Sequence, residues 1–230
     1  MQEEKSKLLI YELNELPRRV YDLYVNKYPN SAFAYFKKEG LIIDTFTKDE
    51  GELHPWSTWP TVHRGVDNKV HNIKFINQDL SCAKKYKPIW QILSENKIDT
   101  GIFGSLQPYP PIKNPNIKFY LPDTFSPDAK ANPKFLSIFQ SFNLEMVNQN
   151  KAISRAIGIS QLNLFYKLFS QGIISFSSLN SILGHLVKEK VNSKYKSRRS
   201  LIQNVLGFQM FLKAVNNNRP EFATYFTNHL

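Results

Sequence analysis

KPIWQILSENKIDTGIFGS, residues 87–105, indicates the fold class because a short helical pattern leads directly into a short apolar strand. The helical part, residues 87–96, has a proline near its start, where the missing N–H does not weaken a helix. A glycine-flanked strand is expected at 99–105 and another at 115–123. Strand and helix alternating at these spacings predict an α/β fold with a mostly parallel sheet and flanking helices.

The chain before this stretch repeats the alternation of apolar runs and helical spacing. A first apolar run ends near Asn14, and it predicts a buried strand. We expect strands at residues 7–13 and 41–46 and short helices at residues 18–27 and 31–38.

Residues 52–66, ELHPWSTWPTVHRGV, are unusually rich in tryptophan, proline and histidine. The prolines argue against a regular element, so the segment is predicted to be a loop, with a helix that could open at Thr61. Ser57 and Thr58 then lie between aromatic side chains just before a helix start, a position that favours an oxyanion or a phosphate. The alternative is that the tryptophans are core anchors and Thr58 only caps the helix.

After residue 132 the strand signals stop and helical apolar spacing takes over. The net charge of +11 is concentrated here, because residues 151–218 hold ten Lys or Arg side chains and one acidic residue, Glu189. The local excess, densest within 188–199, indicates an anionic partner or a solvated helical face. We therefore expect three parts: an α/β part that bears the nucleophile at 1–131, a basic helical segment at 132–218, and the start of a further, truncated strand at 219–230.

The composition excludes several classes of protein. A single cysteine, Cys82, rules out an intrachain disulfide framework and fits a reducing compartment. The first residues lack the basic start and the long apolar stretch of a signal peptide. No apolar run approaches the roughly 20 residues of a membrane span. We expect a cytoplasmic protein without a membrane span.

The order of several motifs resembles the alkaline phosphatase superfamily, most closely its type I phosphodiesterase/nucleotide pyrophosphatase branch. In that branch an apolar strand ends in an acidic metal ligand, and a P-T-x-T-F-P-N loop then carries the nucleophilic threonine. A P-I-W helix, a glycine and another strand come next. The corresponding segments here read ELNE, PWSTWPT, KPIWQIL and TGIFGS, and the resemblance covers roughly residues 7 to 125.

The resemblance implies a metal-dependent hydrolase of phosphate or sulfate esters, with Thr58 as nucleophile and Trp59 in place of the family phenylalanine. Divalent metal ions, zinc or similar, would activate the hydroxyl. Asn14 falls at or near the first metal ligand, and Glu12 is the other candidate because the two share a strand face. The implied ligands are Asn14, Glu12, Thr58, Asn228 and His229.

The superfamily takes most of its remaining ligands from the second half of its fold, so the chain resembles the first half of a longer enzyme. A separately encoded second half is one expected partner, and the implied substrate is a phosphorylated or sulfated small molecule or glycan. His63 and Arg64 are predicted to approach an anion bound at Thr58. The alternative function is a non-catalytic fragment or binding module whose basic helices hold an anionic partner. Nucleic acid is disfavoured because no recognised nucleic-acid fold surrounds the basic cluster.

Overall fold

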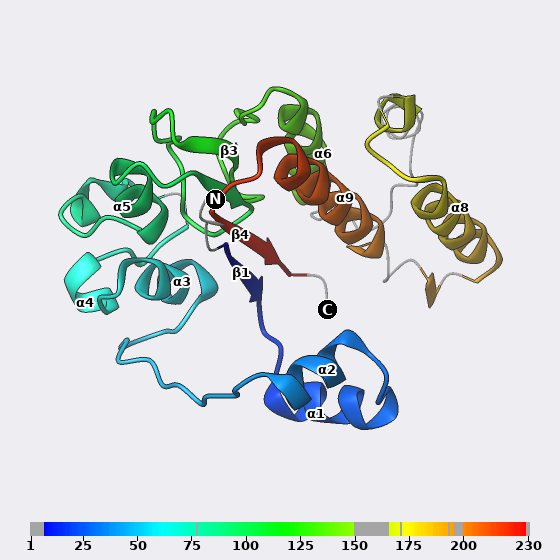
Figure 1. Ribbon diagram of the computed structural model, residues 1–230, viewed down its shortest axis with the longest axis horizontal. Helices are drawn as coiled ribbons and strands as arrows, with labels where there is room; N and C mark the ends of the chain where they lie inside the picture. The colour runs from blue at the N-terminus through cyan, green and yellow to red at the C-terminus, as the bar shows by residue number, and fades with distance from the viewer. Residues whose placement is uncertain are drawn as a thin grey trace, which may run out of the picture.

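A four-stranded, all-parallel sheet forms the centre of the molecule (Figure 1). The structure is a computed structural model that describes residues 7–76, 78–149, 166–170, 172–192, 194–195 and 200–228. The strands are β1 (Leu8–Leu13), β2 (Thr100–Phe103), β3 (Ile117–Leu121) and β4 (Phe222–Thr227), in the order β1-β4-β2-β3. The predicted α/β fold with a mostly parallel sheet is confirmed, as are strands in each of the four corresponding segments.

Strand β4 occupies an inner position although it is the last of the four described strands in sequence order. Phe222 pairs with Leu8 of β1 on one side and with Thr100 of β2 on the other. Its sequence, FATYFT, is apolar and aromatic on both faces, which is typical of a strand buried between two helical layers. The prediction that the first strand is buried is wrong, because β1 forms one edge of the sheet and half of its side chains are exposed.

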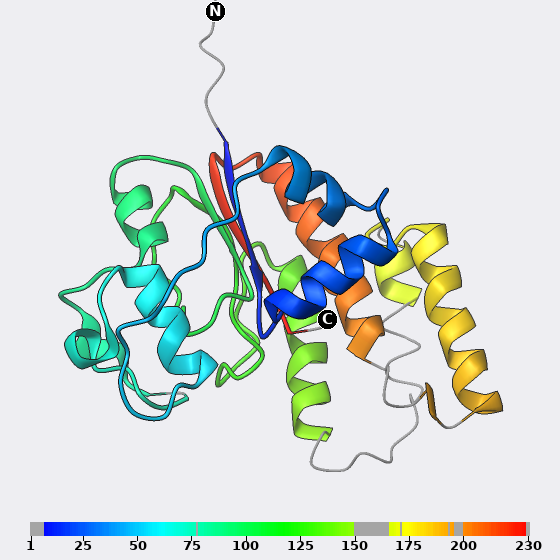
Figure 2. The same cartoon turned by 90° about the horizontal axis from the view of Figure 1, so that it is seen from below.

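Helices cover both faces of the sheet (Figure 2). One face, called the α3 face here, carries α3 (Pro55–Arg64), α4 (Asn68–His71), the 3₁₀ helix η1 (Leu80–Ala83) and α5 (Ile89–Glu95). The opposite face, called the α9 face, carries α6 (Phe135–Gln149), α8 (Phe176–Val191) and α9 (Ser200–Asn218). None of the described helices is long and apolar enough to cross a bilayer.

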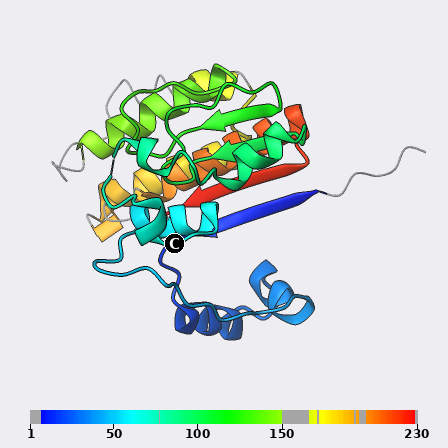
Figure 3. The ribbon, with the colours of Figure 1, turned by 90° about the vertical axis from the view of Figure 1, so that its left-hand side faces the viewer.

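Two hydrophobic clusters hold these layers together, one on each side of the sheet. The larger lies on the α9 face, where Phe103 and Phe119 meet Met210 and Phe211 of α9. The smaller lies on the α3 face around Trp90 of α5. A helical hairpin, α1 (Arg18–Lys27) and α2 (Ala32–Glu39), lies beyond the β1 edge (Figure 3).

Two predictions about residues 41–66 are wrong. Residues 41–46 form no strand, because their apolar side chains find no cover: Leu41 is 84% exposed and Phe46 is 94% exposed. The tryptophan segment is a helix rather than a loop. Pro55 occupies the first helical position, where its missing N–H costs nothing, and Pro60 is accepted one turn later. Helix α3 therefore begins six residues before Thr61 and ends at Gly65, which has a φ of 66°.

The helical character expected after residue 132 is seen in α6, α8 and α9. Within the helical stretch expected after residue 132, residues 150–165 and part of the basic cluster within 188–199 lie outside the described residues.

Candidate functional site

The carboxyl ends of all four strands meet at one edge of the sheet, called the carboxyl edge here, because the strands are parallel. From β1 the chain passes through α1 and α2 before it reaches α3 on one face, and from β3 it leads to α6 on the other face. Strands β4 and β2 lie between β1 and β3 in the sheet. A crevice at such a point, where connections depart to opposite faces, is where open α/β sheets bind ligands. Asn14 and Asn228 directly follow β1 and β4 at this edge.

Two asparagines and a tryptophan form a hydrogen-bonded chain across the carboxyl edge. The indole Nε1 of Trp59 donates to Asn14 Oδ1 at 3.0 Å, and Asn14 Nδ2 donates to Asn228 Oδ1 at 2.6 Å. The Trp59 ring also packs edge-on against Phe226 of β4, with 5.5 Å between ring centroids. Helix α3 is thereby held against the ends of β1 and β4.

A buried pair, Glu12 and His63, makes a second connection between β1 and α3. His63 Nε2 lies 2.9 Å from Glu12 Oε1, and the two residues are 4% and 1% exposed. The imidazole packs between Trp59 and Trp90, at centroid distances of 5.8 and 4.7 Å. Glu12 Oε2 and His63 Nδ1 have no hydrogen-bond partner among the residues that the structure describes. The pair is therefore a polar contact inside an aromatic enclosure.

Thr58 lies within the second turn of α3 rather than before a helix start. Its hydroxyl donates to the carbonyl oxygen of His54 at 3.1 Å, a bond within the same helix. In the described part of the chain, no imidazole or carboxylate hydrogen bonds to this hydroxyl. The residue is half-buried, and its neighbour Trp59 reaches Asn14.

His63 and Arg64, predicted to approach an anion at Thr58, are both engaged elsewhere. The Arg64 guanidinium donates to the carbonyl oxygens of Ala83, at 3.3 Å, and of Tyr86. Burial lowers the pKa of Arg64. Both acceptors lie at or just after η1, so Arg64 links the end of α3 to the η1 segment. His63 contacts Glu12 instead.

A further network beside α3 joins Asp49, Thr61 and His71. The Thr61 hydroxyl lies 2.8 Å from both Asp49 carboxylate oxygens and 3.0 Å from His71 Nε2. Because the N–H of Ile73 donates to His71 Nδ1 at 2.9 Å, Nδ1 is the acceptor and the proton lies on Nε2, which donates to Thr61. Burial foremost lowers the pKa of His71, which favours this neutral form. The Thr61 hydroxyl therefore lies between His71 and Asp49 and hydrogen bonds to both. Because Thr61 belongs to α3 and His71 to α4, this network holds the two helices together.

The candidate metal ligands do not fit a metal centre as they lie. The amide oxygens of Asn14 and Asn228 each accept a hydrogen bond, and one oxygen of Glu12 faces His63. Within the described ranges, no three His, Cys, Asp or Glu side chains are grouped so that they could hold a metal ion. His229 lies outside the described residues.

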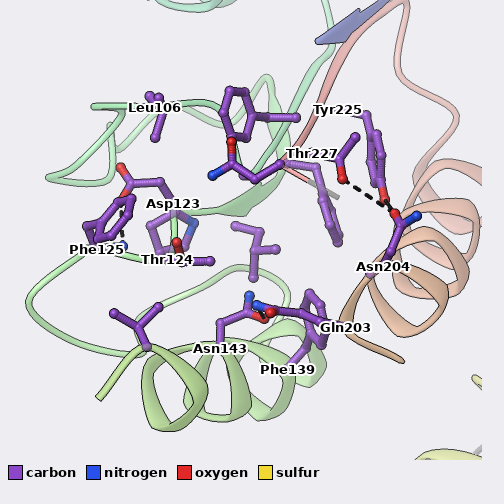
Figure 4. Close-up of a pocket in the computed structure, with 18 residues that line it drawn as sticks. Leu106, Asp123, Thr124, Phe125, Phe139, Asn143, Gln203, Asn204, Tyr225 and Thr227 are labelled. Carbon is purple, nitrogen blue, oxygen red and sulfur yellow. Dashed lines mark hydrogen bonds between the residues drawn. The ribbon is translucent and has the colours of Figure 1, made fainter. Parts of the chain in front are cut away.

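A cleft of about 420 Å³ opens on the α9 side of the carboxyl edge (Figure 4). Asp123 and Thr124 line it from the loop after β3, Asn143 from α6 and Gln203 from α9. Asn228 lines it as well, so the cleft adjoins the asparagine–tryptophan chain. Sequence reasoning missed this cleft because its polar residues come from four segments far apart in the chain.

The Asp123 carboxyl is buried beside the cleft and organises two loops. One of its oxygens accepts from the N–H of Phe125 at 2.7 Å and the other from the N–H of Gln107 at 3.0 Å. Burial raises the pKa of Asp123 to about 6, although both N–H groups favour the charged form. Asp123 therefore ties the loop after β2 to the loop after β3.

Comparisons with protein-family models, with curated proteins and with solved structures found no significant match. The class of this protein is therefore described from its fold and its candidate site alone. The chain is an α/β protein with an all-parallel sheet, a helix bearing Thr58 at the end of β1, and an amide-lined cleft beside it.

Proposed function

We propose that this chain carries the nucleophile-bearing part of a hydrolase of phosphate or sulfate esters, with Thr58 as the nucleophile. The hydrogen bond from Trp59 to Asn14 carries the proposal, because it places the residue next to Thr58 at the carboxyl end of β1. The motif order that resembles the alkaline phosphatase superfamily requires these two segments to be neighbours. Their meeting point lies where α/β sheets hold ligands.

The reaction assigned to Thr58 needs its hydroxyl to turn away from the His54 carbonyl. The threonine oxygen would then bond to phosphorus or sulfur as the bond to the leaving alcohol breaks, and the hydroxyl proton would end on that alcohol. Water would cleave the resulting threonyl ester in a second step. Glu12 and His63 would act as positioning residues, because they hold α3 on β1 without touching Thr58.

The resemblance also implies divalent metal ions, but the described residues do not fit a metal centre, so we assign no step to a metal. Metal dependence is proposed only for a chain completed by further ligands, such as those of a separately encoded partner.

A second candidate function is binding of an anionic ester or partner without turnover. The observation that favours it is the bond pattern of Asn14 and Asn228, whose amide oxygens are already occupied by hydrogen-bond donors. Basic residues of the segment 151–218 would then supply attraction for the anion. This candidate shares the fold and the site with the first but has no nucleophilic step.

The deciding experiment compares Thr58→Ala with Thr45→Ala, a matched loss of one hydroxyl at an exposed position. Turnover of p-nitrophenyl phosphodiesters and sulfate esters is measured with and without divalent cations, and ester binding is measured by calorimetry. Loss of turnover in Thr58→Ala alone supports the nucleophile, and retained turnover refutes it. Ester binding without turnover in the unmodified chain supports the second candidate, whereas neither binding nor turnover refutes both.

A further inference from the structure

The cleft beside β4 offers hydrogen-bonding groups that its own walls do not use. The amide nitrogen of Gln203 donates to Asn143 Oδ1 at 2.8 Å, while Gln203 Oε1 accepts nothing from the described residues. The oxygen of Asn204 accepts from the hydroxyls of Tyr225 and Thr227, at 3.5 and 3.4 Å (Figure 4). Its amide nitrogen donates to no side chain or backbone group in the described part of the chain. Both donors and acceptors are thus open to a ligand.

The charge of the cleft argues against an anion inside it. None of the described residues that line it is Lys, Arg or His. Asp123 is its one carboxyl among those residues, and the backbone N–H groups of Phe125 and Gln107 occupy both of its oxygens. A buried anion without a cationic partner is costly, so the group that fits here is neutral.

Aromatic side chains from several elements line the cleft. Phe103 stacks on Phe139, with centroids 6.2 Å apart and planes 26° apart, and on Tyr225, at 5.5 Å and 23°. Because these three rings stack on one another, they leave no gap between them for a flat base. Aromatic rings interspersed with side-chain amides suit a ring whose C–H faces are apolar and whose rim carries hydroxyls.

We infer that this cleft binds a neutral, hydroxyl-rich ring, the glycosyl part of a phosphate or sulfate ester. The inference rests on the proposed function for the ester, and it adds the class of organic group that the ester carries. Asn228 connects the two, because it lines the cleft and hydrogen bonds to Asn14, the partner of Trp59. The ring would occupy the α9 side of the carboxyl edge, with the charged ester directed toward Thr58.

Binding of sugars can be tested on the full chain without any turnover, so this test and that of Thr58 fail independently. Methyl β-glucoside and methyl β-galactoside are titrated by calorimetry and by amide chemical shifts, with adenosine and inorganic phosphate as competing probes. Asn204→Asp removes the amide donors and keeps the shape and the acceptor oxygens. Asn217→Asp adds the same charge to an exposed position of the same helix and is the matched control.

We expect one of the hexosides to bind weakly and to shift amides at residues 123–125, 203–207 and 226–228. Asn204→Asp should weaken this binding about five- to tenfold, the size expected for a lost hydrogen bond, while Asn217→Asp leaves it unchanged. The inference is overturned if neither hexoside shifts these amides, if adenosine or phosphate shifts them instead, or if both variants bind equally. The shift map of the unmodified chain decides the matter even if Asn204→Asp fails to fold.

Discussion

The indole of Trp59 donates a 3.0 Å hydrogen bond to Asn14 Oδ1, and this bond occupies the oxygen that the resemblance assigns to a metal ion. A phenylalanine, the residue at this position in the family that the motif order resembles, has no N–H and would leave that oxygen open. Trp59 therefore joins α3 to β1 by a direct bond between two side chains. The bond holds the residue next to Thr58 at the carboxyl end of β1 and competes with a metal ion for Asn14 Oδ1.

Opening the Asn14 position should create affinity for a divalent cation. In the double variant Asn14→Asp/Trp59→Phe, the indole donor is gone and a carboxylate replaces the amide, so Mn²⁺ should bind about tenfold more tightly than to the unmodified chain. Water-proton relaxation measures the binding. Asn14→Asp/Trp56→Phe is the matched control, since Trp56 has no hydrogen bond to Asn14. Equal Mn²⁺ affinity in the two double variants would contradict the blocking role of Trp59.

Glu12 and His63 should be strongly coupled in their contributions to the free energy of unfolding. Glu12→Ala leaves the imidazole without its partner inside an aromatic enclosure, so the free energy of unfolding should fall by about 3–5 kcal/mol. The double variant Glu12→Ala/His63→Ala should lose less than the two single variants add up to. Urea unfolding measures all three, with the half-exposed His54→Ala as control. Additive losses would show that the two side chains act independently.

Arg64→Met should lower stability rather than only activity. The guanidinium donates to two backbone carbonyls near η1, and losing hydrogen bonds from a charged group should cost about 1.5–3 kcal/mol. Thermal unfolding reports the change, and Arg19→Met, at an exposed position of α1, should have almost no effect. An unaltered unfolding temperature in Arg64→Met would instead favour a direct role in anion binding.

The buried Asp123 should make the unfolding free energy fall as pH rises toward neutrality. Its pKa is 3.8 in an unfolded chain and about 6 in the folded protein. Between these values the folded state holds the proton and the unfolded state does not, so raising the pH favours unfolding until about pH 6. The difference in unfolding free energy between the unmodified chain and Asp123→Asn should follow this curve.

The difference in unfolding free energy between the two proteins is compared, because His71 changes the stability of both with pH in the direction opposite to Asp123. Its lowered pKa means that the unfolded chain takes up a proton first as the pH falls below 6.5, so acid favours unfolding there. The unfolding free energies of the unmodified chain and of Asp123→Asn are measured by denaturant unfolding from acid to neutral pH. A difference that does not vary with pH would show that Asp123 is ionised in the folded state throughout.

The open edge of β1 should promote self-association. Leu8 and Leu9 are 60% and 51% exposed, and the strand has a neighbour only on the β4 side within the described sheet. Leu9→Lys should reduce light scattering and the aggregated fraction in sedimentation. Leu23→Lys, on an exposed position of α1, is the matched control. If both substitutions improve solubility equally, surface charge rather than the strand edge is responsible.

Local patterns predicted most elements, because runs such as KLLIYEL and EFATYF carry their own strand signal. They could not predict that β4 pairs with β1 and β2, since strand order depends on contacts between distant segments. The prediction of a loop at residues 52–66 is wrong because its two prolines argue against a helix interior, whereas Pro55 occupies the first position of α3, where proline is favourable.

The candidate site was predictable only where the order of motifs along the chain links two segments. The proximity of Asn14 to the tryptophan segment followed from the resemblance. The pairing of Glu12 with His63 spans 51 residues, and no periodicity reports it. The cleft draws on Asp123, Asn143 and Asn204, which only the packing of α6 and α9 on the sheet brings together.

The inner position of β4 constrains the order of events during synthesis on the ribosome. Asn14 and Asn228, which meet in the native protein, are 214 residues apart, so β1 emerges long before its hydrogen-bonding neighbour exists. Pairing of such distant segments is intrinsically slow, and unpaired strand edges make incompletely folded chains prone to aggregate. Between the synthesis of β1 and that of β4, the backbone of β1 that pairs with β4 therefore stays exposed, and this part of the sheet closes only when β4 inserts.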